Sequence, residues 1–318
     1  MDIRFLLSRL GEVAQLSTLR RAGLSDAEIR ELVRARHLIR LRRGWYCSSA
    51  ADRDQRRAVT VHGVVGCSSA LARLGVWSGV DRALHIHVPR NAARLGTAVG
   101  PLEGSDIPVF HPLTPDRLRR GIRPSAPASA PRVHWAEERD RAAALDWIVS
   151  PSTALAEASR CLDPLHAQAA VDSMIGERVM TAASVRRVLA SLPSTHGLVV
   201  DELSGRIESG AESIFVRRLQ AAGYQVEPQF RLPGHGRYDG LIEGCVLFDI
   251  DGWAFHSERE QFAADRDRTL VAQAFGMPLI RATATQVLDD WPTVRAAVDR
   301  VVGDARMLRG VRRLPAAG

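Results

Sequence analysis

Residues 237–256, RYDGLIEGCVLFDIDGWAFH, constrain the fold of this chain more than any other stretch. Their pattern predicts a β-hairpin in which a short strand ends at Asp239 and the glycine after it, residues 243–244 form the turn, and an apolar run leads to Asp249 and Asp251. Side chains two residues apart on a strand share a face, and the turn folds Asp239 back beside them. Three neighbouring carboxylates repel one another unless a cation lies between them, and hard oxygen ligands suit Mg²⁺ or Mn²⁺. The hairpin therefore predicts a divalent metal site.

The charge of the chain points to a polyanionic partner. Its net charge is +7 and its pI is about 10.1, which favours DNA or RNA over an acidic small molecule. All 43 basic residues are arginine, and the chain contains no lysine. A mechanism that needs a catalytic lysine is therefore excluded.

The length of 318 residues is too great for one ordinary core and predicts several domains. We expect an α/β protein, α+β overall. Its predicted parts are a winged helix-turn-helix (1–48), a small α/β region (49–130), a helical connector (131–199), a second α/β domain with a mixed sheet flanked by helices (200–305), and a basic tail (306–318).

No apolar run approaches membrane-spanning length and the amino terminus lacks a signal-peptide layout, so we expect a cytoplasmic protein without a membrane partner.

The amino-terminal residues show the pattern of a winged helix. Ser17 is a candidate N-cap for one helix, Ser25 and Glu28 form a capping-box pair at the start of the next, and alternating residues predict a wing that turns at 43–44. Residues 1–45 contain ten arginines and five acidic residues. In this arrangement the second helix enters a major groove and the wing contacts phosphates. The predicted DNA-contacting residues are Arg34, Arg36, Arg40, Arg42 and Arg43.

Short motifs run in a fixed order through the first hundred residues: Ala22-Gly23-Leu24-Ser25, Arg43-Gly44-Trp45-Tyr46, residues 67–76 and residues 85–89. This order resembles the amino-terminal domain of the AbiEi-type antitoxins of type IV toxin–antitoxin systems. The resemblance implies a winged-helix fold with a DNA-contacting role.

The middle of the chain predicts packing rather than chemistry. We expect a helix over 68–74, strands over 83–88 and 107–111, and a helix capped by Ser152. His85 and His87 share a strand face and are interpreted as structural. The four cysteines are scattered without paired spacing, which argues against a zinc site and a disulfide framework and predicts small buried side chains. They are Cys47, Cys67, Cys161 and Cys245.

A second set of motifs covers the last third of the chain: Ala211-Glu212-Ser213, Tyr238-Asp239-Gly240, the run 248–252, His256, and 265–267 followed by Arg281. Together they resemble the PD-(D/E)xK nuclease superfamily and, within it, the very-short-patch-repair (Vsr)-like endonucleases. The resemblance implies a restriction-endonuclease-like sheet and a Mg²⁺- or Mn²⁺-dependent site.

By this resemblance Asp239 is the metal-binding carboxylate, Asp249 the second ligand, and Glu212 the helix acid that binds the metal directly or through water. Asp251 takes the position that the superfamily usually fills with lysine. Vsr-like enzymes also lack that lysine and use a nearby histidine, so His256 becomes the candidate general base or acid.

Two functions follow from these features. The first is a metal-dependent DNA endonuclease in repair, restriction or defence, with phosphate contacts from Arg237, Arg266 and Arg281. The second is a non-catalytic DNA-binding regulator of the antitoxin kind, whose nuclease-like domain is degenerate. RNA stays open as a substrate, as does a partner protein or a homodimer, and no organic cofactor is expected.

Overall fold

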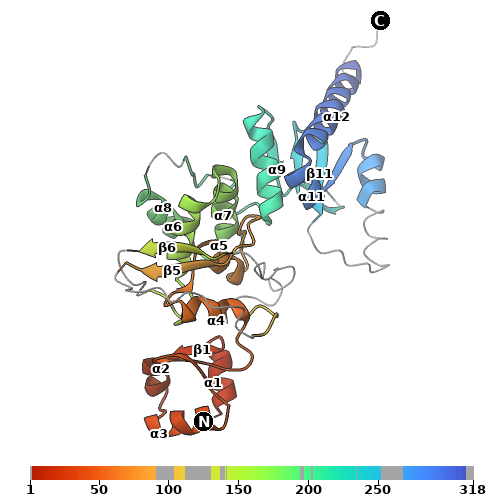
Figure 1. Cartoon of the computed structure of the whole chain (residues 1–318). Helices are drawn as coiled ribbons and strands as arrows, with labels where there is room; N and C mark the ends of the chain where they lie inside the picture. Colours follow the sequence, from red (N-terminus) through yellow and green to blue (C-terminus); the bar gives the residue numbers. More distant parts are fainter. Residues whose placement is uncertain are drawn as a thin grey trace, which may run out of the picture. The chain divides into compact units, whose positions relative to one another are not determined.

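The computed structural model describes residues 2–90, 104–111, 130–136, 140, 142–193, 197–201, 203–233, 235–251 and 268–312. The chain divides into two compact units, residues 1–199 and 200–318. Each unit combines helices with small sheets, which confirms the predicted α+β fold (Figure 1). Among the described residues, no helix combines the length and the apolar character needed to cross a membrane.

The first unit begins with a three-stranded antiparallel sheet, in the order β1-β3-β2, and three helices. This element order is the one expected of a winged helix. The Ser25–Glu28 capping box is confirmed, whereas Gln15 rather than Ser17 precedes the middle helix. The elements are α1 (Ile3–Arg9), β1 (Val13–Gln15), α2 (Leu16–Arg21), α3 (Asp26–Arg34), β2 (Ile39–Arg42) and β3 (Trp45–Cys47).

The rest of the first unit is built on a second three-stranded sheet, in the order β4-β5-β6. Strand β5 runs antiparallel to β4 and parallel to β6, and α5 packs against β5 on one side and α6 on the other. The elements are α4 (Arg53–Thr60), β4 (Val64–Val65), α5 (Cys67–Arg73), β5 (His85–Pro89), β6 (Arg132–Ala136), α6 (Pro151–Cys161), α7 (Pro164–Gly176) and α8 (Ala182–Ala190). Helix α6 is capped by Ser150 rather than by Ser152.

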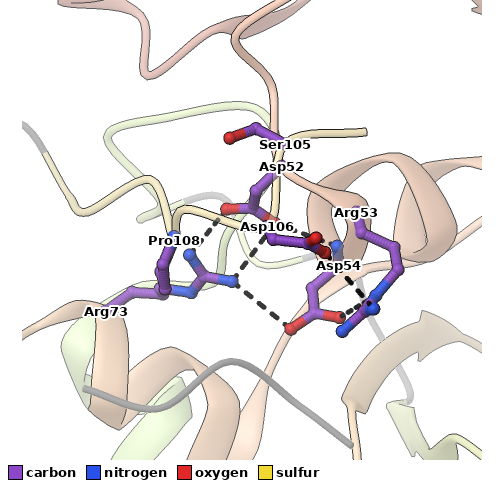
Figure 2. A pocket seen from close by; sticks show the side chains of 7 residues that line it. All are labelled: Asp52, Arg53, Asp54, Arg73, Ser105, Asp106 and Pro108. Atoms are coloured by element: carbon purple, nitrogen blue, oxygen red, sulfur yellow. Dashed lines mark hydrogen bonds and ion pairs between the residues drawn. The ribbon is translucent and has the colours of Figure 1, made fainter. Parts of the chain in front are cut away.

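A buried ion pair holds segment 104–111 against α4 and α5 (Figure 2). The Arg73 guanidinium lies 2.6 Å from the Asp52 carboxylate, which also caps α4 and accepts the main-chain N–H of Val109 at 2.7 Å. The same guanidinium donates to the Val109 carbonyl at 2.9 Å. These side chains form the hydrogen bonds that a neighbouring strand would otherwise form. Residues 107–111 are not a strand, so that prediction is wrong. The small pocket beside them lies where α4, α5 and this segment pack together.

The winged helix and the middle sheet belong to one unit because buried polar contacts join them. The Trp147 indole N–H donates to the Leu10 carbonyl at 3.0 Å, and the Gln55 amide donates to the Gly11 carbonyl at 2.7 Å. The Gln15 main-chain N–H donates to the Asp146 carboxylate at 2.8 Å. Residues 1–199 are therefore one compact unit, in which these contacts join the predicted parts.

The second unit is a four-stranded mixed sheet, in the order β12-β11-β10-β7, with helices packed on it. Only the β11–β12 pair is parallel among the described strands of this sheet. The elements are α9 (Gly210–Ala221), β7 (Val226–Pro228), β8 (Arg231–Leu232), β9 (Gly236–Arg237), β10 (Gly240–Ile242), β11 (Val246–Asp251), β12 (Leu279–Thr283), α11 (Ala284–Asp289) and α12 (Trp291–Arg312). Helix α12 continues through residues 306–312, so that stretch is helix rather than a separate tail.

The predicted hairpin is present as β10 and β11, with Ile242 opposite Val246. Its turn residues Glu243 and Gly244 both have positive φ, which matches the right-handed twist of the strands. The first strand begins at Gly240 instead of ending there, so Asp239 lies just before it and opposite the end of β11. Phe248 of β11 packs against Phe215 of α9, with ring centroids 4.9 Å apart. This core fixes the carboxyl end of β11.

Gly240 is the position where the hairpin tolerates no side chain. An added Cβ would lie 2.4 Å from the Phe248 ring and 2.6 Å from the Glu227 carbonyl. We expect Gly240→Ala to lower the free energy of unfolding of the second unit by about 3 kcal/mol, because both the ring and the neighbouring strand must shift.

Urea unfolding of the full chain, read by hydrogen exchange of the 236–251 peptide, measures this loss. Gly244→Ala is the matched control, since its φ is +64° and its added Cβ meets no atom within 4 Å. It should cost only the left-handed backbone penalty of about 1–2 kcal/mol. Equal losses in the two variants would contradict the steric account.

Candidate functional site

The end of the hairpin brings Asp239 and Asp249 together. The Asp239 main-chain N–H donates to Asp249 Oδ1 at 3.1 Å, and the Ile250 N–H donates to Asp239 Oδ2 at 2.6 Å. The two strands thus bind each other's carboxylates through their own backbones. Asp249 is 6% exposed. The predicted proximity of these two acids is therefore confirmed, and it follows from the pairing of Gly240 with Phe248.

Glu212 supplies a third acid from the first turn of α9. Its Oε2 accepts the main-chain N–H groups of Glu208 at 3.0 Å and Ser209 at 3.3 Å, as part of a capping box. The side chain is only 2% exposed. Burial, followed by the nearby charge of Asp239, raises the pKa of Glu212 to about 8.

Gln229 connects Glu212 with Asp239. Its side-chain Nε2 donates to Glu212 Oε1 at 2.9 Å, and its main-chain N–H donates to the Asp239 carbonyl at 2.7 Å. The residue holds a left-handed backbone with φ +57°, a strained conformation for a residue with a Cβ. Its Oε1 is buried without a hydrogen-bond partner. The site therefore contains one further oxygen that can accept a hydrogen bond or bind a cation.

Arg268, in helical residues 268–274, is a member of the site that the sequence did not single out. Its guanidinium contacts both oxygens of Asp249, at 2.8 Å and 2.9 Å, and also donates to the Arg237 carbonyl at 2.7 Å. The guanidinium lies over the Tyr238 ring at 4.8 Å from its centroid. The DRDR run offered no signal that separates Arg268 from Arg266, because only the tertiary fold selects which arginine meets Asp249.

The remaining predicted residues of this domain are not all gathered at the acids. The Asp251 side chain is 48% exposed and binds Arg281 at 2.9 Å, so Asp251 does not join the buried acids as predicted. Arg237 pairs with Glu208 at 2.8 Å. His256 and Arg266 lie outside the described residues.

The winged-helix arginines fall into two groups. Arg36, Arg40 and Arg43 are exposed. Arg34 is exposed and pairs with Glu31 on the same helix. Arg42 is committed to the fold, because its Nε donates to the Val59 carbonyl at 2.8 Å and its guanidinium lies over the Trp45 ring. These contacts hold the wing, and the phosphate contact of Arg42 stays a prediction.

Burial dominates the electrostatics of the acidic site. Burial raises the pKa of Asp239 to about 6, and burial also raises the pKa of Asp249 although Arg268 opposes the shift. Carboxylate and amide oxygens are the ligands that Mg²⁺ and Mn²⁺ prefer, so the donor set fits such an ion. Among the described residues, however, the grouping of potential ligands that could hold an ion does not include these three acids. Solvent or substrate oxygens would have to complete the coordination shell.

Comparisons with known proteins give little further information. No protein-family model matches the chain, and no curated protein sequence matches it. Among solved structures, the crystal structure of the RV2827C protein from Mycobacterium tuberculosis aligns at 18% identity and a TM-score of 0.26, covering 60% of this chain and 70% of that one. A similarity at this level carries no argument about function.

The raised pKa of Glu212 makes stability depend on pH. The folded protein keeps the proton at pH values where the unfolded chain has lost it, so stability should fall as pH rises from 4.5 to about 8 and then level off. Glu212→Gln removes this titration. We expect it to match the wild type at about pH 5 and to be more stable by on the order of 2–4 kcal/mol at about pH 8.5.

Urea unfolding read by hydrogen exchange of the 240–251 peptide tests this expectation. Asp304→Asn, in an exposed ion pair with Arg300 on α12, serves as the control and should keep the wild-type pH slope. Parallel slopes for wild type and Glu212→Gln would mean that this carboxyl ionises normally.

Proposed function

We propose that this chain is a cytoplasmic, metal-dependent endonuclease that hydrolyses DNA phosphodiester bonds and is anchored on DNA by its winged helix. The observation that carries the proposal is the pair Glu212 and Asp239. Both carboxyls are held by neutral hydrogen-bond donors, namely an amide side chain and main-chain N–H groups, while burial raises the pKa of each. Carboxyls in such an arrangement either keep a proton or are compensated by a cation, and a divalent ion is the compensation that we propose.

The residues that would hold the cation are Asp239, Asp249 and Glu212, with the Gln229 Oε1 as an additional oxygen. A bound Mg²⁺ or Mn²⁺ would supply Lewis-acid chemistry to the phosphodiester. The main-chain donors to Asp239 and Asp249 fix the orientation of both carboxylates before any ligand arrives. His256 is proposed as the group that moves the proton.

Arg268 places a permanent positive charge at the acidic site. Because a guanidinium keeps its proton, Arg268 is suited to neutralising phosphate charge and not to acting as a base. Its forked contact with Asp249 would have to loosen when Asp249 binds a cation. We propose that a scissile phosphate binds the Arg268 guanidinium in place of one Asp249 oxygen. Substrate binding would then be coupled to the release of Asp249.

A second candidate function is a DNA-binding regulator with a degenerate nuclease domain. The specific observation in its favour is the same Arg268–Asp249 pair, since an internal cation already satisfies that carboxylate. Asp251 is likewise satisfied by Arg281. In this alternative the winged helix carries the function and the acidic site is structural.

Cleavage of supercoiled plasmid by the full chain separates the two candidates. With Mg²⁺ or Mn²⁺ we expect nicking that EDTA abolishes, and we expect Asp239→Asn and Glu212→Gln to lower the rate at least about 100-fold because each removes a charged ligand. Asp304→Asn should cut at the wild-type rate. Absence of cutting on supercoiled, mismatched and single-stranded DNA would favour the regulator.

DNA binding by the winged helix is tested by its salt dependence. Each phosphate contact that is lost lowers the slope of log K against log salt by about 0.9. We therefore expect Arg40→Ala/Arg43→Ala to bind duplex DNA more weakly, with a slope smaller by about 2. The control Arg300→Ala/Arg295→Ala removes two charges from α12. If control and wing variant change the slope equally, the wing is not the contact surface.

A further inference from the structure

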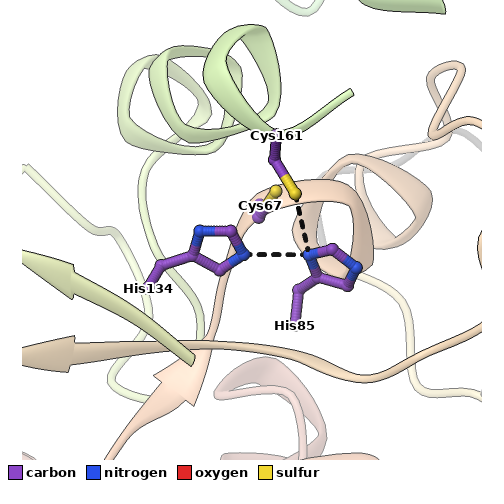
Figure 3. Close-up of side chains that lie close together, drawn as sticks. All are labelled: Cys67, His85, His134 and Cys161. Atoms are coloured by element: carbon purple, nitrogen blue, oxygen red, sulfur yellow. Dashed lines mark hydrogen bonds between the residues drawn. The ribbon is translucent and has the colours of Figure 1, made fainter. Parts of the chain in front are cut away.

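A second cluster of metal-ligating side chains lies in the first unit and is independent of the acidic site. It consists of Cys67, His85, His134 and Cys161, whose donor atoms all lie within 4.8 Å of one another (Figure 3). The predicted burial is confirmed for Cys67, whereas Cys161 is only half-buried, and the scattered spacing did not indicate that these two lie together. Linear spacing gave no signal, because the four residues come from four different elements.

The fold brings the four residues onto one side of the second sheet. Cys67 is the first residue of α5 and Cys161 is the last residue of α6, and these two helices pack together. His85 and His134 lie on the parallel strands β5 and β6, where His87 pairs with His134. His85 and His134 therefore share a face of the sheet. Each element contributes one donor to a common point.

Two donor–donor distances in the cluster lie close to those of a tetrahedral site. His85 Nδ1 lies 2.9 Å from His134 Nε2 and 3.8 Å from Cys161 Sγ, and the two imidazoles stack with centroids 5.1 Å apart. Zinc bonds of about 2.0–2.1 Å to nitrogen and 2.3 Å to sulfur place tetrahedral donors about 3.3–3.8 Å apart. A small opening of the imidazole pair would thus admit the ion.

The atoms around the cluster hold the His85 ring in the orientation a metal needs. Asp81 Oδ2 lies 3.4 Å from His85 Nε2 and is itself held by Arg132 at 3.0 Å and by the Ala83 N–H at its other oxygen, at 2.9 Å. A carboxylate on Nε2 selects the tautomer whose Nδ1 carries a lone pair facing the cluster. This is the carboxylate–histidine arrangement that accompanies metal-binding histidines.

Cys67 is held in an unusual backbone conformation for a residue with a side chain. Its φ is +47°, in the left-handed region, and its main-chain N–H donates to Glu157 Oε2 at 2.9 Å. Glu157 also binds His87 Nδ1 at 2.7 Å, and His87 is not among the residues whose donor atoms gather in the cluster. A strained backbone that is fixed from several sides is typical of residues retained for function. Here the strained residue contributes one of the two sulfurs.

We propose that Cys67, His85, His134 and Cys161 bind one zinc ion in a closed, structural Cys₂His₂ site. Two thiolates and two imidazoles in tetrahedral arrangement favour zinc over the hard cations of the acidic site. The ion ties α5 and α6 to strands β5 and β6. Its role is to hold together the middle of the first unit, and it takes no part in phosphodiester chemistry.

Metal analysis of the full chain tests the proposal. Protein produced with added zinc and passed over a mild chelating resin should contain about one zinc per chain, and Cys67→Ser or Cys161→Ser should contain less than about one tenth of that. Cys47→Ser and Cys245→Ser, which change the other two free cysteines, should keep the ion. Asp239→Asn should also keep its zinc. The outcome for the zinc site can therefore be told apart from the outcome for the acidic site.

Two further measurements use the wild-type protein, so they do not depend on a variant that folds. Cobalt substitution should give thiolate charge-transfer bands and the strong visible absorption of tetrahedral Co²⁺. Thiol titration in denaturant without reductant should count four thiols. Two thiols would reveal a disulfide, which peptide mapping would assign to Cys67 and Cys161 if it replaces the site, and zinc-free protein with four thiols after incubation with zinc would also overturn the proposal.

Discussion

The second unit depends on an exchange of hydrogen bonds between two carboxylates and two main-chain N–H groups. Asp239 and Asp249 are bound by each other's strands, so the hairpin cannot slip by one residue without losing both contacts and turning Asp249 to the opposite face. Phe248, buried against Phe215, fixes the same register from the apolar side. Charge and packing thus specify one alignment of β10 and β11, and the alignment defines the site.

The absence of lysine shapes the electrostatics of this site. Arginine cannot release its proton at physiological pH, so Arg268 and Arg281 serve as fixed charges and orienting groups. Arg268 satisfies Asp249, while Glu212 and Asp239 are left with neutral donors. The result is an uneven distribution, with one acid neutralised internally and two acids that a divalent ion would stabilise. In the nuclease proposal the two acids with neutral donors bind the metal ion. In the regulator proposal the internally neutralised Asp249 marks a structural site.

Local features were predictable from the sequence, and tertiary partners were not. The turn at Glu243 and Gly244 and the Ser25–Glu28 capping box depend on neighbouring residues, and both are present. The approach of Asp239 to Asp249 follows from hairpin register alone. Arg268 was missed because a helix brings it from far along the chain, and Cys67 with Cys161 was missed because parallel strands and packed helices bring distant residues together. Segment 107–111 has an apolar pattern, but buried side chains take its backbone groups in place of a strand partner.

The parallel pairing of β11 with β12, which lies at one edge of the described strands of this sheet, has a consequence for how the site holds together. Parallel neighbours need a long crossover connection, and Arg268 lies on the crossover between these two strands. The strand pair and the Arg268–Asp249 contact therefore both depend on the connection that brings β12 beside β11. Detachment of that edge would expose Asp249 to water and separate it from the Arg268 guanidinium in one event. The acidic site is thus complete only in the closed sheet, and partial unfolding of one edge is enough to dismantle it.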